Sequence, residues 1–229
     1  MNIQGLNKVT LLDFPGKVAC TVFTGGCDFR CPFCHNSQLV LRPAASPTDA
    51  EAFFSFLKKR KGILDGVAVT GGEPLLQPDI AGFLTRVKEM GFAVKIDTNG
   101  NHPEALAKLL GSGLCDFVAM DVKNSPGRYP ETVGIPGFDI SNVLRSISLL
   151  RSSDVDHEFR TTAVREFHDI DSFRGIASMI EGAPRYFVQN FVDSGAVLSS
   201  GLHGFDPGEL EAFAAEVAPH VGSASVRGV

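Results

Sequence analysis

Three cysteines lie within one short loop of the chain, at Cys27, Cys31 and Cys34. The gaps of three and two residues let all three thiolates point at a single metal centre, and the chain shows no obvious fourth cysteine ligand. Iron–sulfur cubanes normally take four cysteine ligands. A cluster held by only three would leave one iron open to a small molecule, as catalytic zinc sites keep one position open. The spacing therefore predicts a metal centre that carries out chemistry.

Other interpretations of these cysteines stay open at this point. His35 follows Cys34 directly, so a Cys3His zinc site is a second hypothesis, although adjacent residues rarely reach one tetrahedral ion without strain. A disulfide is a third, disfavoured because cytosolic thiols are usually kept reduced. Cys20 and Cys115 lie in apolar runs, and free cysteine behaves as a small hydrophobe, so both are predicted to be core residues.

Composition narrows the class of protein. The 229 residues, 44% of them hydrophobic and 21% charged, are typical of a soluble globular protein with one sizeable core. A net charge of −5 argues against a general nucleic-acid binder, which usually carries a basic stripe. No apolar stretch reaches the roughly 18 residues of a membrane span, and residues 1–8 lack the order of a signal peptide. We therefore expect a cytoplasmic protein that binds neither nucleic acid nor a membrane.

Strand-like and helix-like segments alternate along nearly the whole chain. Short runs rich in β-branched or aromatic residues are typical of buried parallel strands. These runs are 18–24, 66–70, 92–98, 115–122, 155–164 and 185–191. Between them lie helix-start signals such as Ser46-Pro47, because proline is favoured at a first helical position. The helices expected are 48–61, 79–90, 104–110 and 209–220, with further starts near residues 139 and 171.

The alternation predicts an α/β fold. Regular β-α order implies a parallel sheet with right-handed crossovers. Six such units are too few for a full eight-stranded barrel, so we expect an open or partial barrel, with a doubly wound sheet as the alternative. Residues 125–137, rich in Pro and Gly, are expected to form a long loop. Residues 1–229 are predicted to be a single domain, with a core at about 16–195 and a C-terminal helical tail at 196–229.

Polar residues gather where the expected strands end, which is where parallel α/β folds place functional residues. Besides the cysteine loop, three further segments follow expected strands, at residues 70–74, 97–100 and 121–123. Arg160 lies in the fifth expected strand, and Gln189-Asn190 near the end of the sixth. Each segment alone could be a turn or a helix cap, but their common position favours one active site.

Several of these residue types suit the binding of a charged ligand. Gly71 and Gly72 would let the backbone approach a ligand closely. Glu73 could accept hydrogen bonds from a cationic amine. Lys123 and Arg160 could pair with a carboxylate or with a developing negative charge.

Two carboxylates in the same set suggest a cation. Asp97 and Asp121 would repel each other at close range unless a cation lay between them. With the Thr98 hydroxyl and nearby carbonyls they would form an all-oxygen site suited to a hard cation. The sequence therefore predicts a monovalent or divalent ion on Asp97, Thr98 and Asp121.

Taken together, the motifs resemble those of a known family. Cys27-x3-Cys31-x2-Cys34, with Phe33 before the last cysteine and 71–73 downstream, is similar to the radical S-adenosylmethionine (SAM) superfamily. Residues 31–36, 97–100 and 121–123 resemble glycyl-radical-enzyme activating enzymes. Residues 13–16 and 23–27 are most similar to activating proteins of anaerobic ribonucleoside-triphosphate reductase. The resemblance runs from about residue 1 to 195.

The resemblance implies a partial (β/α)6 barrel that holds a [4Fe–4S] cluster on Cys27, Cys31 and Cys34 and binds SAM. It implies that Lys123 acts with these cysteines in catalysis, that the Phe33 backbone and His35 face the adenosyl part, and that Glu73 faces the amino group. The full set of implied cofactor-binding residues is Phe33, His35, Gly71, Gly72, Glu73, Asp97, Asn99, Asp121, Lys123 and Arg160.

The implied activity is that of a radical SAM oxidoreductase. One electron from the reduced cluster would split the sulfonium, giving methionine and a 5′-deoxyadenosyl radical that takes hydrogen from a glycine of a partner enzyme. Anaerobic ribonucleotide reductase is the expected partner, and a flavodoxin or ferredoxin type protein the expected electron donor. The alternatives are an activase of pyruvate formate-lyase or of another glycyl-radical enzyme, and a radical enzyme acting on a small metabolite.

The chain also departs from some activating enzymes. Those of pyruvate formate-lyase place a cofactor-contacting histidine after the sixth strand, whereas residues 189–193 contain none. Some activases insert an eight-cysteine segment where residues 37–70 here contain no cysteine, so one cluster is expected. Both departures favour the ribonucleotide-reductase type. A surface or core role is expected for the remaining histidines, which are His102, His157, His168, His203 and His220.

Overall fold

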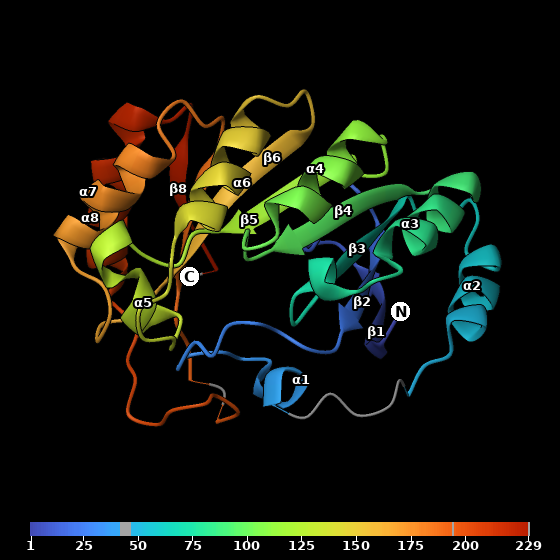
Figure 1. Cartoon of the computed structure of the whole chain (residues 1–229), viewed down its shortest axis with the longest axis horizontal. Coiled ribbons are helices and arrows are strands. Elements are labelled where there is room, and N and C mark those ends of the chain that lie inside the picture. Colours follow the sequence, from blue (N-terminus) through green and yellow to red (C-terminus); the bar gives the residue numbers. More distant parts are fainter. Residues whose placement is uncertain (42–46, 194, 229) are drawn as a thin grey trace. The chain divides into compact units, whose positions relative to one another are not determined.

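The computed structural model describes residues 1–41, 47–193 and 195–228, and Figure 1 labels its elements. Backbone contacts divide the chain into two compact units. Unit 1 comprises Met1–Asp28, Gln38–Thr98 and Glu104–Val118, and unit 2 comprises Phe29–Ser37, Asn99–Pro103 and Ala119–Val229. The division passes through the cysteine loop, so that Cys27 belongs to unit 1 and the other two cysteines to unit 2. The single domain predicted from the sequence stays a prediction.

Unit 1 is built on a sheet whose strand order follows the chain. Its strands are β1 (Ile3–Thr10), β2 (Ala19–Thr24), β3 (Gly66–Gly71) and β4 (Ala93–Thr98). β2, β3 and β4 run parallel, and Thr24 at the end of β2 pairs with Gly71 at the end of β3. Val67, Ala68 and Val69 are fully buried, as the strands of a covered parallel sheet require. The carboxyl ends of these strands lie at one edge of the sheet.

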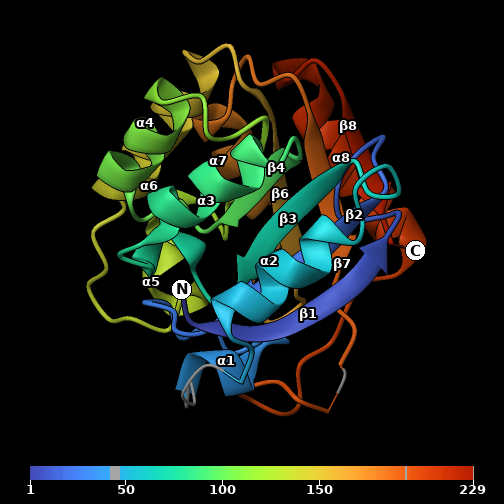
Figure 2. The same ribbon diagram turned by 90° about the vertical axis from the view of Figure 1, so that its right-hand side faces the viewer.

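β1 precedes the first strand that the sequence predicts, and it was missed. It runs antiparallel to β2 at the outer edge of unit 1 (Figure 2), with register shifts between Ile3 and Gly5 and between Asn7 and Thr10. These shifts break the two-residue period by which a strand is recognised in sequence. Its apolar residues consequently fall at Ile3, Leu6 and Val9, which is no strand pattern.

Unit 1 also contains helices. They are α2 (Ala50–Lys58), α3 (Ile80–Glu89), most of α4 (Pro103–Gly111) and, at the border of the units, α1 (Ser37–Leu41). α2 and α3 are neighbours in Figure 1, and the Phe53 and Phe83 rings stack with centroids 5.2 Å apart. Helix α2 begins at Ala50, whereas the sequence predicts a helix that begins at residue 48. Ser46, part of the predicted start signal, lies outside the described residues.

Unit 2 also combines parallel strands with helices. β5 (Phe117–Asp121) begins in unit 1 and ends in unit 2, and β6 (Asp156–Ala163), β7 (Tyr186–Asn190) and β8 (Ala224–Arg227) follow within unit 2. Its helices are α5 (Tyr129–Thr132), α6 (Ser141–Arg151), α7 (Ile170–Met179) and α8 (Pro207–Val217). α7 and α8 lie side by side, with the rings of Phe173 and Phe213 stacked 4.2 Å apart. Thr162 of β6 pairs with Gln189 of β7, so the two strands end level.

The strands and helices confirm most of the predicted elements. All six predicted strands are present, as β2 to β7, with ends shifted by a few residues. Two expectations were wrong. Residues 125–137 are not a plain loop, because they contain a 3₁₀ turn at Pro126–Arg128 and α5. The predicted helical tail at 196–229 contains α8 but also the parallel strand β8, which pairs with β7.

The two cysteines outside the loop also agree with expectation. Cys20 and Cys115 are buried free thiols, and burial raises the pKa of each to about 12, so both remain protonated core residues. Within the described ranges, no helix combines the length and the apolar character needed to cross a membrane.

Candidate functional site

The cysteine loop follows β2 directly. Cys31 is buried, Cys27 and Cys34 are half-buried, and all three are thiols outside any disulfide. Cys34 N–H donates a hydrogen bond of 3.0 Å to the Cys31 carbonyl, which closes a tight turn between them. Burial raises the pKa of the Cys31 thiol to about 11, although the Lys123 ammonium acts in the opposite direction and favours the thiolate.

Residues of unit 2 hold the loop between the first and second cysteines. The Phe29 ring meets the edges of the Tyr129 and Phe138 rings at 6.5 and 5.2 Å. Arg30 N–H donates to the Val133 carbonyl at 2.8 Å. Gly134 has φ 68°, and a Cβ there would lie 2.4 Å from the Arg30 carbonyl oxygen, so only glycine fits. The path of the loop within unit 2 is therefore defined by packing.

The segment after β7 contacts the other end of the loop. His35 Nε2 lies 2.7 Å from the Val192 carbonyl oxygen, and its ring stacks on Phe191 with centroids 5.4 Å apart. Ser199 N–H donates to the Pro32 carbonyl at 2.9 Å. Because one His35 nitrogen is used on backbone, His35 acts here as a brace of the loop. Its predicted place beside the adenosyl part of SAM stays a prediction.

The Gly71-Gly72 pair in unit 1 is required by backbone packing. A Cβ on Gly71, which has φ 119°, would lie 2.3 Å from Thr24 N, and one on Gly72 would lie 2.0 Å from the Gly26 carbonyl oxygen. Gly72 N–H and Glu73 N–H donate to the Thr24 and Gly26 carbonyls at 2.9 and 2.8 Å. The end of β3 thus supports the residues that lead into the first cysteine. The sequence predicted that these glycines let the backbone approach a ligand closely. The structure shows that they lie against the backbone of Thr24 and Gly26.

Glu73 is fully buried at the start of a 3₁₀ turn, Pro74–Leu76. Its Oε1 accepts hydrogen bonds from Leu75 N–H at 3.0 Å and from the Thr98 hydroxyl at 2.9 Å. The end of β4 therefore positions this carboxylate. A buried carboxylate needs hydrogen-bond donors or cations around it, which suits the predicted binding of an amino group.

Asp97 is paired with a lysine that the sequence analysis did not consider. Lys95 Nζ donates to Asp97 Oδ1, and the two side chains are only 2% and 16% exposed. They share a face of β4 because they are two residues apart. The sequence held a signal for this pair, since a lysine interrupts an otherwise apolar strand on the face that carries the aspartate. Asn99, just beyond the strand, accepts a hydrogen bond from Asn101 N–H at 2.9 Å.

In unit 2, Asp121 is the centre of a charged triad. Arg160 Nε donates to its Oδ1 at 2.9 Å, and Lys123 Nζ donates to its Oδ2 at 3.0 Å. Burial favours the neutral acid, but the two cations hold the pKa of Asp121 well below its usual range. Burial likewise opposes the charge on Lys123, while Asp121 and the nearby Cys31 raise its pKa above the usual value. All three side chains are therefore charged at neutral pH.

Buried neighbours place the lysine of this triad. Lys123 N–H donates to the Tyr129 hydroxyl at 3.2 Å, and the Lys123 carbonyl lies 2.8 Å from His168 Nε2. His168 is almost fully buried, and desolvation lowers its pKa, so the neutral ring can donate to this carbonyl. A core role for His168 agrees with expectation. Asn190, in contrast, binds the Phe205 backbone through both ends of its amide and so shapes the approach to α8.

The cysteine loop fits an iron–sulfur cluster by its donor chemistry. It offers three thiols outside any disulfide, and Lys123 lies close enough to Cys31 to favour a thiolate. Across residues 1–41, 47–193 and 195–228, no three His, Cys, Asp or Glu side chains are already gathered as a metal site. The fit therefore rests on the type and spacing of the thiols.

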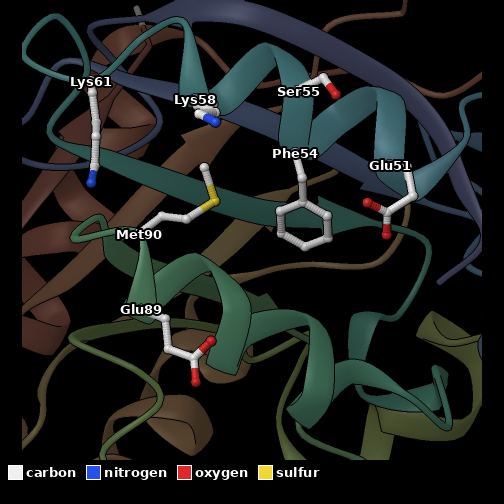
Figure 3. Close-up of a pocket in the computed structure, with 7 residues that line it drawn as sticks. All are labelled: Glu51, Phe54, Ser55, Lys58, Lys61, Glu89 and Met90. Atoms are coloured by element: carbon white, nitrogen blue, oxygen red, sulfur yellow. The ribbon is translucent and has the colours of Figure 1, made fainter.

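One pocket lies away from the predicted residues. It has a volume of about 410 Å³ and lies between α2 and α3 in unit 1 (Figure 3). Phe54 and Met90 provide apolar surface there, and charged side chains such as Lys58 and Glu89 surround them. None of the predicted cofactor-binding residues lines it.

Comparisons with known proteins agree with the motifs. The family model of the radical SAM superfamily matches residues 21–174. A protein of Methanocaldococcus jannaschii, provisionally named a glycyl-radical enzyme activating enzyme, is 36% identical over 195 residues, which cover 82% of this chain and 79% of that protein. The pyruvate formate-lyase-activating enzyme of Listeria monocytogenes is 33% identical over 157 residues, 62% of this chain and 63% of the enzyme.

A solved structure shows the fold. SuiB of Streptococcus suis, in its crystal structure bound to SAM, superimposes with a TM-score of 0.68 at 16% identity, over 89% of this chain and 48% of SuiB. The predicted α/β fold with a partial barrel is thereby confirmed. The chain spans less than two thirds of the Listeria enzyme and about half of SuiB.

The family match also decides between the hypotheses for the cysteines. Radical SAM enzymes use a [4Fe–4S] cluster and SAM, which confirms these two predicted cofactors over structural zinc or a disulfide. The family model and the long match to the Methanocaldococcus protein show that this chain belongs to the radical SAM superfamily, among its glycyl-radical-enzyme activating enzymes.

Proposed function

We propose that this protein activates a glycyl-radical enzyme by removing a hydrogen atom from a glycine Cα of that partner. The observation that carries the proposal is the 36% identity, over 79% of its length, to the Methanocaldococcus protein that is provisionally named a glycyl-radical enzyme activating enzyme. The motif residues add support, because they lie at strand ends within each unit. We place the protein in the cytoplasm, where its thiols would stay reduced.

Cys27, Cys31 and Cys34 would hold the cluster. When bound, the cluster supplies the electron that splits the sulfonium of SAM, with methionine and 5′-deoxyadenosine as the final products. The protein's own residues bind and orient the cofactor and exclude side reactions. The tight turn from Cys31 to Cys34 and the brace from His35 to Val192 restrict the loop that would carry the open iron.

The triad in unit 2 suits the carboxylate of SAM. Asp121 offsets only one of the two positive charges on Lys123 and Arg160, so the triad carries one positive charge in excess. A guanidinium and an ammonium that are already placed by a shared carboxylate lose little freedom when an anion binds. Glu73 in unit 1, buried and ordered by Thr98, suits the amino group of SAM.

We further propose anaerobic ribonucleotide reductase as the partner and a flavodoxin or ferredoxin type protein as the electron donor. The first proposal is supported by residues 13–16 and 23–27, which resemble activating proteins of that reductase, and by the absence of a histidine in residues 189–193. Pyruvate formate-lyase is the second candidate, since an enzyme named for its activation matches over 62% of this chain. A small metabolite as substrate is the third possibility.

The experiment that tests the proposal measures products with and without each partner. Reconstituted protein, a reductant and SAM should form 5′-deoxyadenosine slowly alone and faster with the true partner. One 5′-deoxyadenosine should appear per activated partner chain. Stimulation that survives replacement of the partner's radical glycine by alanine would contradict hydrogen abstraction from that glycine. Rapid turnover with a small molecule and no protein would favour the metabolite enzyme.

A further inference from the structure

The two carboxylates from which the sequence predicts a metal cation, Asp97 and Asp121, each have cationic partners within their own unit. We infer that these protein cations take the place of a bound metal cation, and that Lys95 is the residue that replaces it at Asp97. Lys95 is then a positioning residue, since it acts on SAM through Asp97. The effect on SAM cleavage rests on the proposed function, whereas the absence of bound cation does not.

Burial holds Lys95 and Asp97 of unit 1 together as a pair. Lys95 is 2% exposed, and a buried ammonium is costly unless an anion accompanies it. Its neighbour in the sheet register is Ala68, a small, fully buried residue that cannot supply a charge. Asp97, two residues along the same face, provides the opposite charge. A metal cation on Asp97 would have to compete with an ammonium that is held there by its own burial.

The triad in unit 2 opposes a cation more strongly. Both oxygens of Asp121 already accept hydrogen bonds from cationic groups, Arg160 and Lys123. The set is positive by one charge, so an added cation would meet net repulsion from Lys123 and Arg160, whose side chains are only 16% and 13% exposed. An anion would be attracted there.

Thr98, the third predicted cation ligand, does not change this conclusion. Its hydroxyl donates to Glu73 at 2.9 Å. Because the hydroxyl is neutral, it adds no negative charge that a metal cation would neutralise. The repulsion between Asp97 and Asp121 was the reason to expect a cation. Lys95, Lys123 and Arg160 remove that reason in each unit separately.

The decisive measurement uses the reconstituted protein with SAM under anaerobic conditions. At constant ionic strength, Na⁺, K⁺, Mg²⁺ and tetramethylammonium should give SAM-cleavage rates within about twofold of one another, a difference of only ~0.4 kcal/mol in activation free energy. Thallium NMR should detect no stoichiometric Tl⁺ site, and the melting temperature should not depend on which cation is present. One tightly bound Tl⁺ per chain that K⁺ displaces would overturn the inference.

Variants locate the effect at Lys95. Lys95→Met should create a need for a metal cation, with cleavage at least about tenfold faster in K⁺ than in tetramethylammonium, and a melting temperature that rises with K⁺ concentration. Lys95→Arg should stay indifferent to the cation because it keeps the charge. The double variant with Asp97→Asn should also be indifferent. Cation dependence in Lys95→Arg equal to that in Lys95→Met would contradict a charge effect.

A second lysine–aspartate pair in unit 1 is the control. Lys88 Nζ lies 2.7 Å from Asp116, but the two side chains are 31% and 39% exposed and water can replace either partner. Lys88→Met should create no cation dependence. If Lys95→Met fails to fold, the thallium and rate measurements on the unchanged protein still decide the question. These measurements require no partner enzyme. The cation result would therefore stand even if the protein activated no partner.

Discussion

Two regions of the molecule contain predicted cofactor-binding residues, and different physical effects shape them. In unit 1, the corner at Gly71 and Gly72 is shaped by contact, because backbone atoms there approach too closely for any Cβ. In unit 2, the triad at Asp121 is shaped by charge, with two cations on one half-buried carboxylate. Steric sites fail when volume is added, and electrostatic sites fail when charge is removed. Substitutions can therefore tell the two regions apart.

The cysteine loop, which belongs to both units, should give the largest effect. Cys27→Ala in unit 1 and Cys31→Ala or Cys34→Ala in unit 2 should each abolish the cluster, because three thiolates are its only predicted protein ligands. Iron and sulfide analysis and the visible absorption after anaerobic reconstitution measure this. Cys20→Ala and Cys115→Ala should still hold one cluster per chain. Full cluster content in any of the first three variants would contradict the ligand assignment.

Added volume should damage the corner in unit 1. Gly72→Ala puts a Cβ 2.0 Å from the Gly26 carbonyl oxygen, so strain should lower the free energy of unfolding by about 1–3 kcal/mol. Urea unfolding of the apoprotein checks this. Gly82→Ala is the matched control, since its Cβ in α3 meets nothing within 4 Å, and it should stabilise by about 1 kcal/mol. Equal effects at the two glycines would show that the corner is not tightly packed.

Removed charge should damage the triad in unit 2. Arg160→Met should weaken SAM binding by roughly tenfold or more, because a charge-assisted hydrogen bond to a buried partner is worth about 1.5–3 kcal/mol. Equilibrium binding to the reconstituted protein measures it. Arg174→Met removes an exposed arginine paired with Asp171 and Glu216, and should leave the affinity unchanged. Similar losses in both variants would indicate a general effect of charge.

The smallest expected effect is that of pH, because the contribution of the triad to the free energy of unfolding should not change near neutral pH. The pKa of Asp121 is lowered in the folded state, so its stabilisation is present above its unfolded pKa of about 4 and is lost as pH falls below that value. The pKa of Lys123 is raised, so its contribution is present below about pH 10 and is lost above it. The difference in unfolding free energy between the protein and Asp121→Asn should therefore be constant from pH 5 to 9. A slope in that window, measured by urea unfolding, would show that another group titrates with the triad.

The sequence predicted what depends on local pattern. The six parallel strands and the cysteine spacing follow from apolar runs and from thiol chemistry, which neighbouring residues determine. β1 escaped because its bulges shift the register, and β8 escaped because Ala224–Arg227 is short and only half-buried. Lys95 was missed since a lysine is ordinarily expected on the surface. The predicted strand 92–98 already put Lys95 and Asp97 on one face, but only the structure shows that this face is buried and that the two side chains are paired.

The most direct test of the proposed activity is electron paramagnetic resonance of a partner enzyme. Reduced, reconstituted protein is mixed with SAM and anaerobic ribonucleotide reductase, or with pyruvate formate-lyase. A glycyl-radical doublet should appear with the true partner, and it should vanish when the partner's radical glycine is replaced by alanine or when Cys31→Ala replaces the activating protein. If neither partner gives a doublet while SAM is cleaved and a small molecule is consumed catalytically, the protein is not an activating enzyme.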